Sequence, residues 1–211
     1  MLPVKCVNMV LKTRDRLIEV ARQLFARKGI ENTTMNDIAS ASDKGRRTIY
    51  TYFKNKRDIF NAVVEQETET LINRLTEIEN KNIPATRKIE QYMVCRFETM
   101  REIVSRNGSL KAGFFRDIRK VDRARKAISE AEIEILTRIV RQGIESGQFA
   151  DSNPEHTATV IVHCIHGLDV PYIRDNLAEH GLEQTTVMRS VTEIILNGIR
   201  RRLPCDMSVQ E

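Results

Sequence analysis

The sequence predicts an all-α protein in which an N-terminal three-helix unit, containing a helix-turn-helix, precedes a larger helical domain. The 211 residues include only five prolines and nine glycines, the residues that most often interrupt helices. Hydrophobic residues make up 41% and charged residues 30% of the chain, as in an ordinary globular protein. Apolar residues also recur at spacings of three and four, the period of an amphipathic helix. These observations favour helices in almost every part of the chain.

The composition disfavours several classes of protein. The longest apolar stretch, residues 158–170, is shorter than the roughly 20 residues of a membrane span and contains His163, His166 and Asp169. Residues 1–11 lack the apolar core and cleavage site of a secretory signal, so we expect a cytoplasmic protein with no membrane partner. The four cysteines lie far apart, without the spacing of a zinc site or a disulfide framework, and we expect reduced thiols.

The positive charge is concentrated at the N-terminal end. Residues 1–60 hold 13 Lys and Arg against 6 Asp and Glu, whereas residues 61–211 hold 21 against 23. Such an asymmetry suggests a surface for a polyanion, although many proteins with basic surfaces bind no nucleic acid. We divide the chain at the same place, into a DNA-binding domain (residues 1–60) and a second domain (residues 61–211).

The first helix is expected over residues 13–28. Thr13 can cap its start, and Gly29 can end it in a Schellman-type stop, with Ile30 folding back on the helix. One face carries the apolar stripe Leu17, Val20, Ala21, Leu24 and Phe25.

A second, short helix should begin after Thr34, which forms a capping box with Asp37. Residues 42–45 have the composition of a turn, and residues 46–53 return to helix. Ile49 and Phe53 are the strongly apolar pair of this third helix, so they should face inward.

The opposite face of residues 46–53 predicts contact with DNA. At 100° per residue, Arg47 and Thr51 point away from the apolar pair, and the face contains no acid. Arginine can bond guanine, threonine can contact thymine, and tyrosine can reach a phosphate. Asn55 should cap a further helix, whose N-terminus, with Lys56, can bind one phosphate. The alternative is a plain three-helix bundle with a basic surface.

Two runs in this region resemble the DNA-binding signature of the tetracycline-repressor (TetR/AcrR) family. They are residues 33–39 (TTMNDIA) and residues 48–56 (TIYTYFKNK), followed by Ile59 and Phe60. The resemblance covers about residues 10–62. It departs in the turn, where Asp43 and Lys44 replace a common glycine and valine, and Arg47 stands where glycine is frequent. The predicted DNA-binding residues are Thr34, Asn36, Lys44, Arg46, Arg47, Thr48, Tyr50, Thr51, Tyr52 and Lys56.

Behind this region the pattern predicts further helices. One should run from Lys56 to about residue 80, and the next from Pro84 to the break at residues 107–108. After a short segment with Phe114 and Phe115, helices are expected over residues 122–145 and over residues 153–180, the second with a bend at Pro171. A last helix, after Gly181, should carry the apolar residues from Val187 onward and end at about residue 202.

The family resemblance implies that the second domain binds a small effector and forms a homodimer. The last two helices have apolar stripes, and Gly167 and Gly198 would allow close approach, so a four-helix interface is expected there. The alternative is that these apolar stripes are buried in the core of a single chain and form no interface between copies. The residues predicted to line an effector pocket, with simple core as the alternative, are Met93, Phe97, Met100, Phe114, Phe115 and His163.

Three functions are therefore compared. The first is a repressor that binds a palindromic operator as a dimer and is released by an effector. The second is a DNA-binding protein of the same fold without a small ligand. The third is a metal-dependent enzyme using His163, Cys164, His166 and Asp169, of which the two histidines share a helix face. We expect the first, with no catalytic residue, metal ligand or cofactor.

Overall fold

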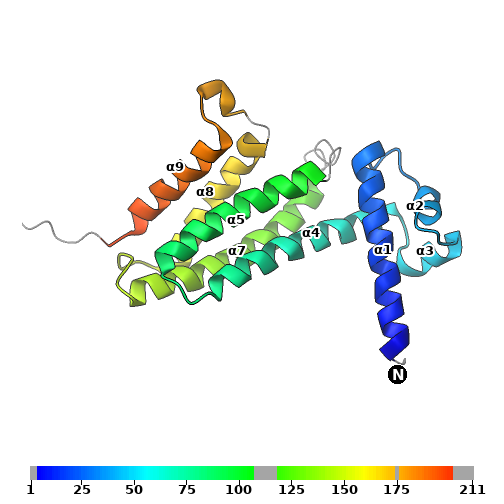
Figure 1. Ribbon diagram of the computed structural model, residues 1–211, viewed down its shortest axis with the longest axis horizontal. Coiled ribbons are helices and arrows are strands. Elements are labelled where there is room, and N and C mark those ends of the chain that lie inside the picture. The colour runs from blue at the N-terminus through cyan, green and yellow to red at the C-terminus, as the bar shows by residue number, and fades with distance from the viewer. Residues whose placement is uncertain (1–3, 107–117, 174–175, 202–211) are drawn as a thin grey trace, which may run out of the picture. The chain divides into compact units, whose positions relative to one another are not determined.

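The computed structural model describes residues 4–106, 118–173 and 176–201, and the regular structure in these ranges is helical (Figure 1). The elements in chain order are α1 (Val4–Lys28), α2 (Met35–Ala41), α3 (Arg46–Tyr52), α4 (Lys56–Glu79), α5 (Ala85–Arg106), α7 (Ile118–Glu145), α8 (Pro154–Ile173), the short 3₁₀ helix η1 (Ala178–His180) and α9 (Gln184–Ile199). The all-α prediction is confirmed. No helix within the described ranges is long and apolar enough to span a membrane.

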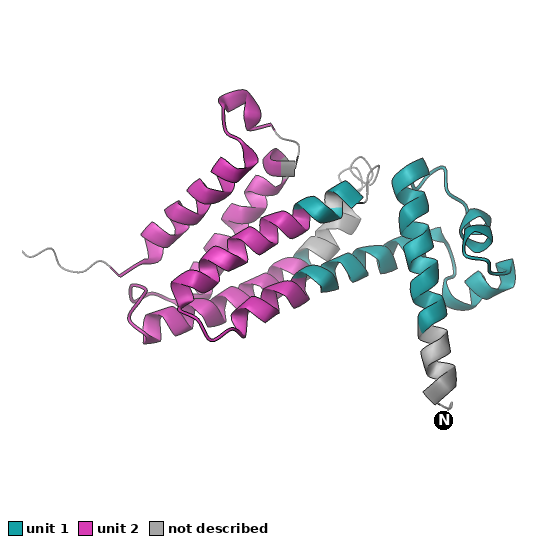
Figure 2. Cartoon of the chain, viewed as in Figure 1, with its two compact units in different colours: residues 1–71, 101–127 teal, residues 72–100, 128–211 magenta. Residues whose placement is uncertain are grey.

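Contacts divide the chain into two compact units, which Figure 2 colours separately. Unit 1 comprises residues 1–71 and 101–127, and unit 2 comprises residues 72–100 and 128–211. Helices α4, α5 and α7 each contribute residues to both units.

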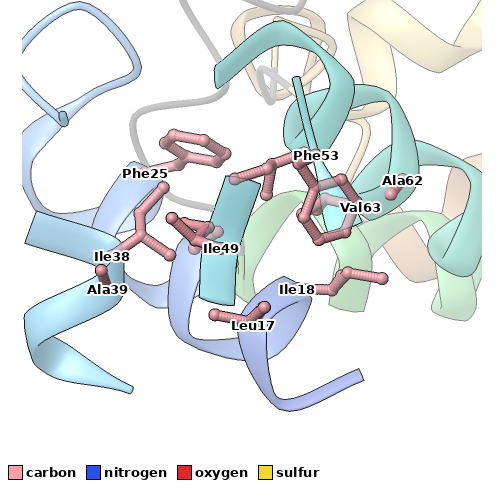
Figure 3. Packing of buried hydrophobic residues seen from close by; sticks show 11 residues of the cluster. Leu17, Ile18, Phe25, Ile38, Ala39, Ile49, Phe53, Ala62 and Val63 are labelled. Atoms are coloured by element: carbon pink, nitrogen blue, oxygen red, sulfur yellow. The ribbon is translucent and has the colours of Figure 1, made fainter. Parts of the chain in front are cut away.

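The core of unit 1 joins the first four helices. Leu17 and Phe25 of α1, Ile38 of α2 and Ile49 of α3 are completely buried, and they point toward one another in Figure 3. Burying a side chain of this size contributes about 1.5–3 kcal/mol each, so this cluster is what holds α2 and α3 in place. The inward orientation predicted for Ile49 and Phe53 is confirmed, because they are 0% and 5% exposed.

Several helix ends agree with the local signals. Gly29 takes a left-handed φ of 83° and its N–H donates to the carbonyl of Phe25, as a helix-terminating glycine does. Gly181 also has a positive φ, of 71°, and it ends η1.

Three predicted boundaries are wrong. Helix α1 begins at Val4, not at Thr13, because residues 4–12 contain no proline or glycine to interrupt it. Helix α7 begins at Ile118, four residues before the predicted start. Helix α8 ends at Ile173, two residues after Pro171, and does not continue to His180.

Unit 2 closes on itself where the α7–α8 connection meets the end of α9. Phe149 and Arg200 form an isolated antiparallel bridge, in which the Ala150 N–H donates to the Ile199 carbonyl over 2.8 Å. The Phe149 ring fills the space beside Gly143, where an added Cβ would lie 2.0 Å from a ring carbon. Gly143 is thus required for the close approach of this ring to α7.

Candidate nucleic-acid interface

Helix α2 begins at a capping box, as the sequence predicts. The Asp37 N–H donates to Oγ1 of Thr34 over 3.1 Å, and the Thr34 N–H donates to Oδ2 of Asp37 over 2.9 Å. The hydrogen bonds from the Thr34 backbone and side chain hold the pKa of the Asp37 carboxyl below its usual value. This box fixes the start of the first helix of the helix-turn-helix.

The turn between α2 and α3 is closed by hydrogen bonds to Ala39. The buried Ser42 donates from Oγ to the Ala39 carbonyl over 2.9 Å, and the Lys44 N–H donates to the same carbonyl over 3.0 Å. Between them Asp43 adopts a φ of 54° and places its carboxylate 3.0 Å from the guanidinium of Arg16. The turn is therefore built around a non-glycine residue in the left-handed region, where glycine fits most easily.

Helix α3 exposes a face without acidic residues. Arg47 and Thr51 lie opposite the buried Ile49, with Tyr50 at the flank and Arg46 at the margin of the apolar side, and all four are exposed. The Arg46 guanidinium lies 5.9 Å from the centre of the Tyr50 ring, and Thr51 donates from Oγ1 to the Arg47 carbonyl over 3.1 Å. The hydroxyl proton of Thr51 is thereby committed to its own helix, while the hydroxyl oxygen can still accept a hydrogen bond.

The other predicted DNA-binding residues surround this face with different exposures. Thr48 and Tyr52 are half-buried, and Tyr52 packs against the core of unit 1. Thr34 and Asn36 are exposed, although the Thr34 hydroxyl serves as the helix cap, and Lys44 is half-buried. Arg46, Arg47, Tyr50 and Thr51 are therefore the members of the predicted set that α3 itself places on its open side.

The start of α4 is capped in the way predicted for Asn55. The Asp58 N–H donates to Oδ1 of Asn55 over 3.0 Å, and the Lys54 N–H donates to Oδ2 of Asp58 over 3.1 Å. Lys56 differs from expectation, because its ammonium donates to the carbonyl of Ile30 over 2.6 Å and to that of Glu31 over 3.3 Å. The side chain of Lys56 thus ties α4 to the α1–α2 connection.

The residues predicted for an effector pocket do not share one environment. Met93 and Phe97 are completely buried in unit 2, where the Phe97 ring lies 4.8 Å from that of Tyr172, centre to centre. Met100 is half-buried and His163 is exposed on α8. Phe114 and Phe115 lie outside the described residues.

Sequence reasoning missed a buried polar network in unit 2. The Arg96 guanidinium on α5 donates to both oxygens of Asp169 on α8, over 2.5 and 3.0 Å. It also donates from Nε to Oε1 of Glu132 on α7 over 2.8 Å, and Tyr92 donates to the same oxygen over 2.9 Å. The second oxygen of Glu132 lies 2.6 Å from Nε2 of His166. Three helices are joined by this network.

The charges of the network are set by their mutual contacts. Burial opposes ionisation of Glu132, but Arg96 and His166 outweigh it, so the pKa of this carboxyl is lowered. Burial likewise opposes the charge on Arg96, yet Glu132 and Asp169 raise its pKa. Burial, followed by the nearby charge of Glu132, raises the pKa of the Tyr92 hydroxyl well above its usual value.

The residues considered for a metal-dependent enzyme have other roles in unit 2. Asp169 is paired with Arg96 and His166 with Glu132, whereas His163 and Cys164 are exposed. Among the described residues no group of three or more His, Cys, Asp or Glu side chains could hold a metal ion.

Comparison with protein families matches both parts of the chain. The model described as "Bacterial regulatory proteins, tetR family" matches residues 17–63, which contain α2 and α3, and "Tetracyclin repressor-like, C-terminal domain" matches residues 85–188. A curated relative, "Probable acrEF/envCD operon repressor" of Escherichia coli (strain K12), is 47% identical over 57 residues. These residues are 27% of this chain, and the match spans only 26% of the length of that relative.

Solved structures match over a greater length. A transcriptional regulator from Cytophaga hutchinsonii superposes with a TM-score of 0.72 at 24% identity, covering 89% of this chain and 98% of the other. A TetR/AcrR-family regulator from Thermobifida fusca gives a TM-score of 0.67 at 26% identity, with the same coverage. The helix-turn-helix in unit 1, the two family models and these superpositions agree, and the chain belongs to the TetR/AcrR family of transcriptional regulators.

Proposed function

We propose that this protein is a transcriptional repressor that reads operator DNA with the exposed face of α3. The observation that carries the proposal is the exposure of Arg47 and Thr51 opposite the buried Ile49, with the exposed Tyr50 and Arg46 beside them. An exposed helix face in solvent is usually rich in glutamate and lysine, whereas α3 has no acid. Such a face suits the negative potential of a major groove.

Each side chain on this face has a contact that its chemistry favours. Arg47 is exposed, and its guanidinium can donate two hydrogen bonds, one to O6 and one to N7 of guanine. Thr51 has a methyl group that suits the methyl of thymine, and its hydroxyl, whose proton goes to the Arg47 carbonyl, can still accept from a base amino group. For Lys56 the ammonium is engaged with backbone carbonyls, so the free amides at the start of α4 are the better candidates for a phosphate contact.

Selection of bound sequences from random duplexes, followed by Arg47→Ala, tests the proposal. We expect the selected DNA to be palindromic, and the variant to lose about 1–3 kcal/mol of operator affinity with relaxed preference at one base pair per half-site. Arg87→Ala is the matched control, because Arg87 is an exposed arginine of unit 2. Equal operator affinity for Arg47→Ala and the control would contradict the proposed reading face.

The repressor is proposed to act as a homodimer in the cytoplasm, with residues 1–60 as the DNA-binding part and residues 61–211 as the regulatory part. Val160 on α8 is 62% exposed and Ile194 on α9 is 71% exposed, which supports an interface between copies along these two helices. On a palindromic operator the two recognition helices of such a dimer would enter successive major grooves, which lie about 34 Å apart.

Release by a small effector is proposed for the regulatory part, residues 61–211, with Met93, Phe97, Met100, Phe114, Phe115 and His163 as the residues to test. The match of residues 85–188 to a repressor C-terminal domain supports this assignment. A regulator of the same fold without a small ligand is the second candidate, since Met93 and Phe97 are completely buried within the core. A thermal-shift screen against metabolites separates the two, because an effector that binds the folded state raises the melting temperature.

A further inference from the structure

The ion pair between Asp43 and Arg16 lies beside the candidate reading helix. Asp43 precedes the first residue of α3 by three positions, and its Oδ2 accepts from the Arg16 guanidinium over 3.0 Å. Both side chains are open to solvent, at 86% for Asp43 and 57% for Arg16. In a helix-turn-helix the N-terminal residues of the second helix contact the bases, so the turn before them comes close to the duplex.

A carboxylate is an unfavourable group at this place. Its charge repels the phosphates of any duplex, and its backbone φ of 54° lies in the region that glycine adopts without strain. A surface ion pair adds little to the free energy of unfolding, so the contact with Arg16 does not compensate for the repulsion of phosphates or for the left-handed backbone. The effect of Asp43 is therefore to be sought in what it does to the guanidinium that it holds.

We propose that Asp43 limits sequence-independent binding of DNA by holding Arg16 in an ion pair. In the free protein the pair is neutral, and a phosphate that approaches Arg16 must first displace the carboxylate. Without Asp43, the guanidinium of Arg16 would be available to the phosphates of every duplex, whatever its sequence. This inference rests on the proposed function, since it requires that α3 face DNA.

The test measures the affinity of the full chain for a mixed-sequence duplex over a range of salt concentrations. Asp43→Asn removes the charge and keeps a residue type that tolerates a left-handed φ, and Asp43→Gly provides a second variant with the same loss of charge. In both variants we expect tighter binding. The slope of the logarithm of the binding constant against the logarithm of the salt concentration should be steeper by about 0.9, the contribution of one additional phosphate contact. Thermal melting of each variant checks that the fold is intact.

Two controls separate the pair from a general change of charge. Asp151→Asn removes one exposed carboxylate from unit 2 and should leave the salt slope unchanged. The double variant Arg16→Gln with Asp43→Asn should return the slope to that of the wild type, because the released guanidinium is then absent.

The possible results are distinct. The inference is overturned if Asp43→Asn matches Asp151→Asn, if it steepens the slope equally with and without Arg16, or if it weakens binding, as loss of a carboxylate that reads a base amino group would. If the wild-type chain binds no duplex at any salt concentration, the proposed function itself fails, and the inference fails with it.

Discussion

Arg96 carries a buried positive charge in the interior of unit 2. It is 1% exposed, and its guanidinium is shared between Glu132 and Asp169, which lie 36 and 73 residues further along the chain. Removing one partner from a buried ion pair leaves a charge without compensation, which costs far more than the pair itself contributes. The network therefore tolerates change at a single residue poorly.

Asp169→Asn tests this dependence. The substitution keeps the size of the side chain but removes one of the two carboxylates that face Arg96, so we expect a loss of about 3–5 kcal/mol in the free energy of unfolding. Urea denaturation measures it. The matched control is Glu90→Gln, which removes the carboxylate that accepts from the exposed Arg87 and should remain close to the wild type. A loss no greater than that of the control would show that the buried pair is not needed for stability.

Single residues of both units show where prediction from sequence succeeds and where it fails. Ile49 could be placed inward because it is the one strongly apolar residue of α3, whereas Phe53 is buried from the extended residue that follows the helix. The burial of Met93 and Phe97 on α5 is compatible with either of the two roles that the sequence left open. Tyr92 and Arg96 lie one position before them, but their partners are on distant helices. No local pattern identifies such partners, so the network could not be predicted.

At the scale of whole helices, ends were predictable where one residue determines them. Thr34 and Asn55 cap their helices with side-chain oxygens, and Gly29 ends α1 with a left-handed backbone. The predicted start of α1 was wrong because a threonine is also acceptable within a helix. The predicted end of α8 was wrong because the helix stops at Ile173, before His180. Signals that only favour an end are weaker than residues that enforce one.

Helices α8 and α9 carry the prediction for assembly. Ile194 is 71% exposed in the single chain, so an aspartate there should not disturb the fold of one copy. If α8 and α9 form the interface, Ile194→Asp should bury a charge between the copies and convert the dimer to monomers. Sedimentation velocity measures the change. Val94→Asp, at a 37% exposed position on α5, is the control that should remain dimeric. An unchanged dimer for Ile194→Asp would exclude this face.

For the whole molecule, the buried carboxylate of Glu132 predicts how stability varies in acid. Its pKa in the folded protein is lowered from an ordinary value of 4.5, so the unfolded chain binds a proton more readily than the folded one does. The stabilisation from Glu132 is therefore fully present above about pH 4.5 and is lost as the pH falls through the lower, folded pKa.

Urea denaturation at neutral pH and at successive acidic pH values measures this dependence. Glu132→Gln should be less stable than the wild type at neutral pH, yet should lose less stability on acidification, because the titrating group is gone. Glu134→Gln, an exposed neighbour on α7, should follow the wild type. Parallel acid profiles for wild type and Glu132→Gln would contradict the assignment.

The bridge between Phe149 and Arg200 determines from which end α9 can come loose. Two backbone bonds, from Ala150 to Ile199 and from Arg201 to Gln148, fasten its last turn to the connection before α8. At the other end of α9 the Gln184 side chain donates from Nε2 to the carbonyl of Tyr172 over 3.2 Å, so that end is held by a side-chain bond in place of backbone bonds, and we expect fraying to begin there. In hydrogen exchange, deuterium should reach the Val187 amide, which donates to the Glu183 carbonyl at the start of α9, sooner than the amides of Ala150 and Arg201.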